Sequence, residues 1–184
     1  AISYYIEEEN MVFAQGNHDE ILSGTNGLAK SGDNDPISNE YGVFVINEDD
    51  YMWYNNNALT IKNTAYKLQS YLNEKIEEDY NKPIFILSHL ALNYSMRTYY
   101  DGDGQYASFI FDVLNEASNL GLNIIYLFGH NHSNGWDDYL GGSSVYLTKG
   151  DSILIADNSK EEFSERILNF TYMNAGYVGY YRNV

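Results

Sequence analysis

Apolar residues follow two spacings along this chain, one typical of buried strands and one typical of amphipathic helices. Short continuous apolar runs predict buried strands at residues 11–14, 84–89 and 122–130. A spacing of three or four residues predicts a helix over residues 60–79, which Thr60 or Asn63 would cap. The same spacing predicts a second helix over residues 106–120, and Gly121 is placed to end it. This alternation of strands and helices predicts an α/β fold.

The remaining strand signals predict antiparallel pairing. Residues 41–46 and 51–54 are rich in aromatic and β-branched residues and flank the sequence Asn-Glu-Asp-Asp, which is typical of a hairpin. From Ser144 onward, turn residues separate four apolar segments, which predict consecutive β-hairpins: "SSVYLT", "SILIA", "RILNFTYMN" and "GYVGYY". A chain of 184 residues is long enough for one domain with its own core, and no linker divides it.

Composition narrows the classes of function. The net charge of −16 argues against a nucleic-acid backbone or an anionic membrane as the main partner. It would also repel a phosphorylated substrate unless cations offset it. The absence of cysteine excludes disulfides and thiolate sites, and no apolar run approaches the roughly 20 residues of a membrane span. The 19 tyrosines predict many half-buried positions, because tyrosine buries its ring and keeps its hydroxyl in water.

The four histidines occupy equivalent places in the predicted topology. His18, His89 and His130 each follow an apolar run of strand length. His132 lies two residues beyond His130, so both side chains point the same way in an extended backbone. Ligands of open α/β sheets gather beyond the carboxyl ends of the strands. Together, the histidines favour a site for a divalent cation there.

Each polar residue also has an ordinary structural interpretation. A lone histidine at a strand end is more often a surface residue. Asn17 alone is more often a turn residue, and Asp19 alone is more often a helix cap. These interpretations lose weight because all four histidines lie at comparable positions.

Three motifs carry a resemblance to a known family. Gly-Asn-His-Asp-Glu at 16–20, Ser-His-Leu-Ala-Leu at 88–92 and Gly-His-Asn-His-Ser at 129–133 resemble, in this order, the motifs of the calcineurin-like metallophosphoesterases. The resemblance implies an α/β fold with a metallophosphoesterase-like two-sheet β-sandwich flanked by helices. It also implies hydrolysis of phosphate mono- or diesters by metal-activated water. The implied cofactors are two divalent metal ions (Mn, Fe or Zn).

The resemblance also implies roles for individual residues. The implied metal ligands are Asn17, His89, His130 and His132. The first three would bind one metal and His132 the other. His18 resembles the catalytic histidine, which would stabilise the phosphoryl group or protonate the leaving oxygen. Asp19 would hold the ring of His18 in its working tautomer.

The family pattern is incomplete in this chain. The family opens with a D-x-H motif and then a G-D motif, both upstream of G-N-H-D. No D-x-H occurs here, and the Gly-Asp pairs all lie downstream of Asn17. We therefore expect residues 1–184 to be a single metallophosphoesterase domain that is truncated at its N-terminus. The missing N-terminal segment, or another chain, would complete the sheet. We expect weak metal binding and little activity, because one metal would keep only His132.

The predicted loop after the middle histidine, residues 93–105, offers a candidate for substrate binding. Arg97 is that candidate because a guanidinium group presents a fork to phosphate, although a solvated loop arginine is the more common case. Asp-Gly-Asp-Gly-Gln at 101–105 is similar to the opening of a calcium loop, but its later ligands are out of register, which favours a polar turn.

A second function remains open from the sequence. The chain could be a non-catalytic, metallophosphoesterase-like binding or structural module of a larger surface protein. The acidic, cysteine-free composition suits an extracellular or cell-surface location. The retention of all three motifs favours the enzyme, whereas the missing D-x-H motif favours the module.

Overall fold

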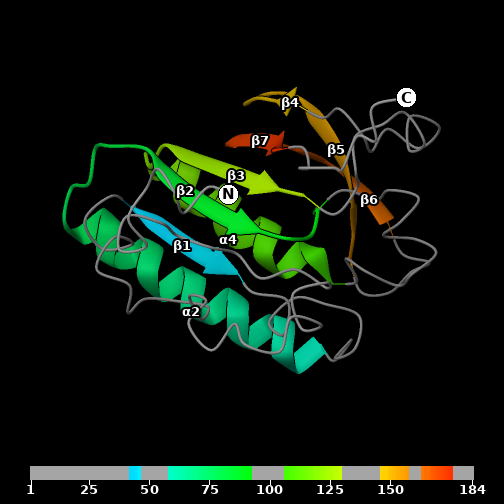
Figure 1. Cartoon of the computed structure of the whole chain (residues 1–184), viewed down its shortest axis with the longest axis horizontal. Coiled ribbons are helices and arrows are strands. Elements are labelled where there is room, and N and C mark those ends of the chain that lie inside the picture. The colour runs from blue at the N-terminus through cyan, green and yellow to red at the C-terminus, as the bar shows by residue number, and fades with distance from the viewer. Residues whose placement is uncertain (1–41, 47–57, 93–105, 130–145, 158–162, 176–184) are drawn as a thin grey trace, which may run out of the picture.

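The computed structural model describes residues 42–46, 58–92, 106–129, 146–157 and 163–175 (Figure 1). These residues form a five-stranded mixed sheet, a two-stranded sheet and two helices. The predicted α/β class is therefore confirmed, whereas the two-sheet sandwich stays a proposal. The strand predicted at residues 11–14 lies outside the described residues.

The larger sheet is parallel over four of its five strands. Its spatial order is β1 (Val43–Ile46), β2 (Ile84–Ser88), β3 (Ile124–Phe128), β7 (Thr171–Asn174) and β4 (Tyr146–Leu147). β1, β2, β3 and β7 run parallel, and β4 is antiparallel to β7. The apolar runs predicted at 84–89 and 122–130 are confirmed as neighbouring strands in the interior of this sheet.

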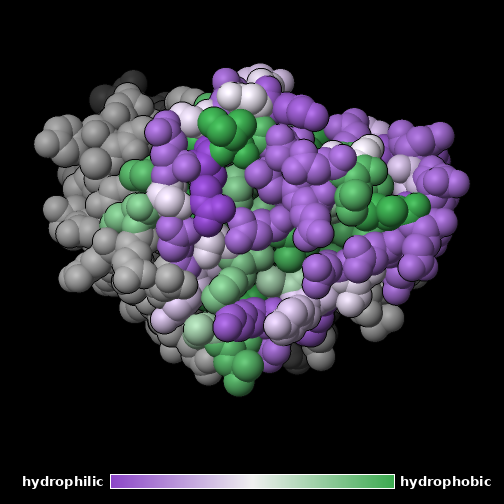
Figure 2. Space-filling view, turned by 180° about the vertical axis from the view of Figure 1, so that it is seen from behind, coloured by the Kyte–Doolittle hydropathy of each residue, from purple (hydrophilic) through white to green (hydrophobic). Residues whose placement is uncertain are grey.

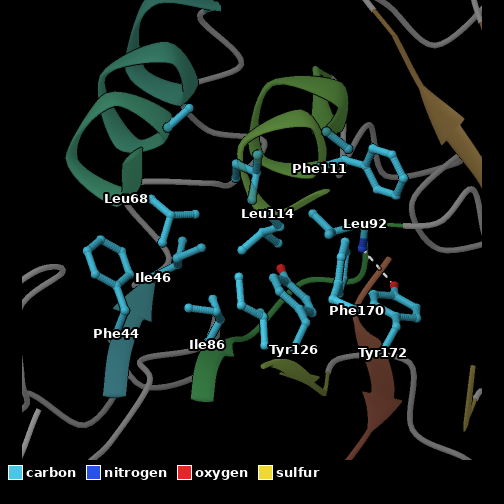
Figure 3. Close-up of a cluster of buried hydrophobic side chains, with 14 of the residues drawn as sticks. Phe44, Ile46, Leu68, Ile86, Leu92, Phe111, Leu114, Tyr126, Phe170 and Tyr172 are labelled. Atoms are coloured by element: carbon cyan, nitrogen blue, oxygen red, sulfur yellow. Dashed lines mark hydrogen bonds between the residues drawn. The ribbon is translucent and has the colours of Figure 1, made fainter. Parts of the chain in front are cut away.

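Helices α2 (Ala58–Glu77) and α4 (Ala107–Asn119) connect β1 to β2 and β2 to β3. Successive crossovers of the same hand in one direction place both helices on one face of the sheet. Figure 3 shows turns of both helices over the same layer of core side chains. Neither described helix is long and apolar enough to cross a membrane.

Both predicted helices are confirmed, with ends that lie within two residues of the predicted bounds. α2 begins at Ala58, so Thr60 and Asn63 lie inside the helix, and the prediction that one of them caps it is wrong. The predicted end of α4 is confirmed. Gly121 has a φ of +111°, its N–H donates to Ser118, and the N–H of Leu122 donates to Ala117. These two bonds satisfy carbonyls that the helix end would leave unpaired.

The core lies between the helices and the sheet. Phe44, Ile86, Tyr126 and Tyr172 form one row across four strands in register, and all are buried. The rings of Tyr126 and Tyr172 stack with centroids 5.5 Å apart. Tyr126 and Tyr172 are fully buried and Tyr71 on α2 is 5 % exposed, so these three are not among the many half-buried tyrosines that were expected.

The other face of the sheet is also apolar. Successive rows on that face comprise Val43, Phe85 and Ile125, then Val45, Leu87 and Leu127. The two valines are buried, and the side chains of β2 and β3 on this face are half-buried. A parallel sheet with two apolar faces is typical of a structure with a layer on each side.

The C-terminal strands do not form the predicted series of hairpins. β5 (Ser152–Ala156) and β6 (Phe163–Ile167) do form an antiparallel pair. The segment predicted as one strand, "RILNFTYMN", is split by residues 168–170, and β7 leaves to join β3 in parallel. Leu168 and Phe170 in the connection are both buried, so the apolar pattern continues through a break in the strand.

Of the hairpin predicted over residues 41–54, only the first strand lies within the described residues, and it is confirmed as β1. β1 covers most of residues 41–46, but its described partner is the parallel strand β2. Residues 51–54 lie outside the described residues.

Seen from behind, the molecule presents mostly hydrophilic side chains, with hydrophobic ones in small separate groups (Figure 2).

Candidate functional site

The carboxyl ends of four parallel strands form one edge of the sheet. Ile46 at the end of β1 is in register with Ser88 at the end of β2, and Phe128 at the end of β3 is in register with Asn174 at the end of β7. The segments that follow these strands therefore begin side by side, at the place where ligands of open α/β sheets bind.

His89 follows β2 directly at this edge. It is half-buried, and its carbonyl accepts a hydrogen bond of 3.2 Å from the N–H of Gly129. Gly129 is the first residue of the third histidine motif and follows β3. This hydrogen bond joins the residues that directly follow β2 and β3 and brings the second and third motifs next to each other. His89 and Gly129 therefore lie next to each other at the carboxyl edge of the sheet.

The segment after His89 turns into the core and is held there by hydrogen bonds. Leu90, Ala91 and Leu92 are all buried. The N–H of Leu90 donates to Oγ of Ser88 at 3.2 Å, and its carbonyl accepts from the hydroxyl of Tyr126 at 2.9 Å. The N–H of Leu92 donates to the hydroxyl of Tyr172 at 2.8 Å (Figure 3). The main chain that follows His89 is thus held by side chains from three strands, Ser88 on β2, Tyr126 on β3 and Tyr172 on β7.

The hydroxyl of Tyr126 is a permanent donor in this arrangement. Burial raises the pKa of Tyr126 far above its ordinary value, and the hydrogen bond with Ser88 lowers it by less. The hydroxyl therefore keeps its proton throughout the physiological range. It can donate to the carbonyl of Leu90 at every pH at which the protein would work.

The other predicted site residues lie outside the described part of the chain. These residues are Asn17, His18, Asp19, Arg97, His130 and His132. The loop 101–105 also lies outside it. Within the described ranges, no three histidine, aspartate or glutamate residues come together as a metal site. His89 is the one predicted ligand that these ranges include, and its imidazole nitrogen at a strand end suits a divalent cation.

A second polar cluster joins α4 to β6. The guanidinium of Arg166 lies 3.3 Å from Oδ1 of Asp112 and 3.0 Å from Oδ1 of Asp157, and it also donates to Oγ of Ser164. Burial raises the pKa of Asp112, the charge of Arg166 lowers it, and that of Asp157 raises it. The cluster contains a cation paired with two carboxylates, so it is best explained as a link between two elements.

Sequence reasoning missed the two tyrosines that hold the His89 segment. A signal was present for Tyr126, which stands in the middle of the apolar strand "IIYLF", whereas Tyr172 lies in the more polar strand "TYMN". A buried tyrosine hydroxyl needs a hydrogen-bond partner. The partners are 36 and 80 residues away, which no local pattern identifies.

Comparison with known proteins adds no relative. Neither protein-family models, nor curated proteins, nor solved structures match this chain.

Proposed function

We propose that this chain carries the site of a metal-dependent phosphoesterase. The observation that carries the proposal is the hydrogen bond between Gly129 and His89, which sets two of the three histidine motifs side by side at the carboxyl edge of a parallel sheet. The remaining motif, the first along the chain at residues 16–20, follows an apolar run of the same kind. Three histidine-bearing strand ends at one edge would give a divalent cation its nitrogen ligands.

The sheet also supports the fold that the resemblance implies. The face opposite the helices carries two apolar rows, so a second layer is needed to bury it. We propose that this layer is the second sheet of a metallophosphoesterase-like sandwich. The sandwich would leave the carboxyl edge, with His89, open to substrate.

The proposed roles divide the chemistry between cofactor and side chains. Two divalent cations, when bound, supply positive charge and lower the pKa of water near a phosphate ester. Asn17, His89, His130 and His132 would hold them. His18 would donate a proton to the leaving oxygen, and Asp19 would fix the tautomer of His18. Cations are needed at this edge because a chain of net charge −16 repels a phosphate dianion.

The two metal positions are unequal in this chain. One position has three candidate ligands, Asn17, His89 and His130, whereas the other has only His132. Affinity rises with the number of ligands that a site provides, so we propose one measurable site and one weak site. Turnover of phosphate esters would be slow for the same reason.

A phosphatase assay tests this proposal. We expect the chain with added manganese to hydrolyse p-nitrophenyl phosphate or its bis-ester slowly, and His18→Gln to abolish that turnover without loss of bound metal. Tyr66→Phe, at an exposed position of α2, serves as the control for a general effect of substitution. Turnover that survives in His18→Gln would refute the catalytic role.

A non-catalytic module is the second candidate, and the missing D-x-H motif favours it. This candidate predicts metal bound through His89 and His130 with no turnover that depends on His18. The same assay, combined with metal analysis, therefore separates the two functions.

A further inference from the structure

Two fully buried tyrosines use their hydroxyl groups to bond main chain outside their own strands. Tyr126 on β3 and Tyr172 on β7 are both 0 % exposed, and phenylalanine would fill these core positions as well. Phe128 already packs against Tyr172, with ring centroids 4.6 Å apart. The hydroxyls are therefore not explained by packing, because burying a hydroxyl is unfavourable unless it is hydrogen-bonded.

Both hydroxyls bond to the main chain immediately after His89. Tyr126 donates to the carbonyl of Leu90, and Tyr172 accepts from the N–H of Leu92. Residues 89–92 belong to no strand or helix, so their backbone groups need partners from elsewhere in the chain. The two tyrosines, together with Gly129 on the carbonyl of His89, supply them.

We propose that Tyr126 and Tyr172 are positioning residues for His89. This inference rests on the proposed function, in which the imidazole of His89 binds a metal. A metal ligand binds tightly only if its direction is fixed before the metal arrives, and groups that orient a ligand typically change metal affinity about 10- to 100-fold. The two hydroxyls would fix the backbone that carries His89 and thereby the direction of its ring.

The position of the Tyr126 and Tyr172 hydroxyls supports a role in orienting His89 rather than a role in general stability. They act at the carboxyl edge, where His89 lies, and they approach the segment from two different strands. By contrast, Tyr71 is a buried tyrosine of the same core whose ring is tilted against that of Phe44, with centroids 5.3 Å apart, and its neighbours are Tyr80, Glu78 and Glu74. Tyr71→Phe removes a buried hydroxyl without touching the His89 segment, so it is a matched control.

The test compares Tyr126→Phe, Tyr172→Phe and the double variant with the parent chain and with Tyr71→Phe. Circular dichroism selects the variants that are folded at the assay temperature. Cobalt(II) is added alone, and its affinity is measured from its visible absorption. We expect each single tyrosine variant to bind cobalt about 10-fold more weakly, and Tyr71→Phe to bind as the parent does.

A second readout needs no metal. The imidazole signals of His89 in the metal-free protein are assigned by their loss in His89→Gln and followed by NMR. We expect one set of His89 ring signals in the parent and in Tyr71→Phe, and shifted or broadened signals in Tyr126→Phe and Tyr172→Phe. This readout works on either single variant, so the proposal is tested even if the double variant does not fold.

The outcomes separate the two proposals. If the parent binds cobalt, and Tyr126→Phe and Tyr172→Phe have the same affinity and the same His89 signals as the parent, the positioning role is refuted and the metal site stands. If no cobalt binds to the parent, the proposed function fails, and the His89 signals alone decide whether the hydroxyls position the ring.

Discussion

Replacing Gly42 by alanine tests whether the start of β1 requires a glycine, because of its backbone conformation and its close contact with Tyr80. Gly42 has a φ of +64° immediately before β1, and its carbonyl accepts the hydrogen bond from Phe85 that opens the pairing with β2. A Cβ atom at this position would lie 2.6 Å from the hydroxyl oxygen of Tyr80 and 3.0 Å from two of its ring carbons. Alanine would therefore be strained in its backbone and crowded in its side chain.

The two effects can be estimated separately. The left-handed conformation disfavours alanine by about 1–2 kcal/mol. Overpacking against the partly buried ring of Tyr80 adds about 1–3 kcal/mol. We expect Gly42→Ala to lower the free energy of unfolding by about 3 kcal/mol, which corresponds to a fall of roughly 10 °C in the midpoint of thermal unfolding.

A double-mutant cycle with Tyr80→Phe isolates the contact. The hydroxyl of Tyr80 is buried and has no hydrogen-bond partner in the described structure, so its removal alone should not destabilise the protein. In the Tyr80→Phe background the closest clash is gone, and Gly42→Ala should cost about 1 kcal/mol less. Urea unfolding followed by circular dichroism measures all four proteins. Additivity of the two substitutions within about 0.5 kcal/mol would refute the close contact.

Two further predictions concern the link between α4 and the β5–β6 pair. The side-chain amide of Asn115 donates to the carbonyl of Ile167 and accepts from the N–H of Asn169, so Asn115→Ala should lower the free energy of unfolding by about 1–3 kcal/mol and speed amide exchange in β6. Unchanged exchange in β6 would contradict this. Because burial raises the pKa of Asp112, its contribution favours the folded state at low pH and is lost as the pH rises through the folded-state pKa. Asp112→Asn should therefore gain stability relative to the parent as the pH rises from the ordinary carboxyl pKa of about 3.9 through the raised folded-state pKa, and a relative loss there would show that the pair with Arg166 dominates.

The sequence predicted the elements of the sheet better than their pairing. β2 and β3 were recognisable because a strand buried on both faces is a continuous apolar run, and α2 and α4 because one face of each is apolar. The break between β6 and β7 was not recognisable. Leu168 and Phe170 are buried in the connection as fully as strand residues would be, so burial there does not reveal that the backbone turns. Parallel pairing of β7 with β3 is likewise set by tertiary contacts.

The site was predicted in part. The carboxyl edge and the place of His89 followed from residue type and strand polarity, which are local features. The anchoring by Tyr126 and Tyr172 did not, because it joins residues that only the folded sheet brings together. Five of the six expected metal-binding or catalytic residues lie outside the described residues, so their roles stay predictions.

The metal content of purified protein tests the central claim most directly. The parent chain, His89→Ala, His130→Ala and His18→Gln would be dialysed to equilibrium against manganese or zinc and analysed for bound metal. We expect the parent and His18→Gln to bind metal at the one site with three ligands, and both alanine variants to lose it. Equal metal content in all four proteins, or none in the parent, would contradict the account.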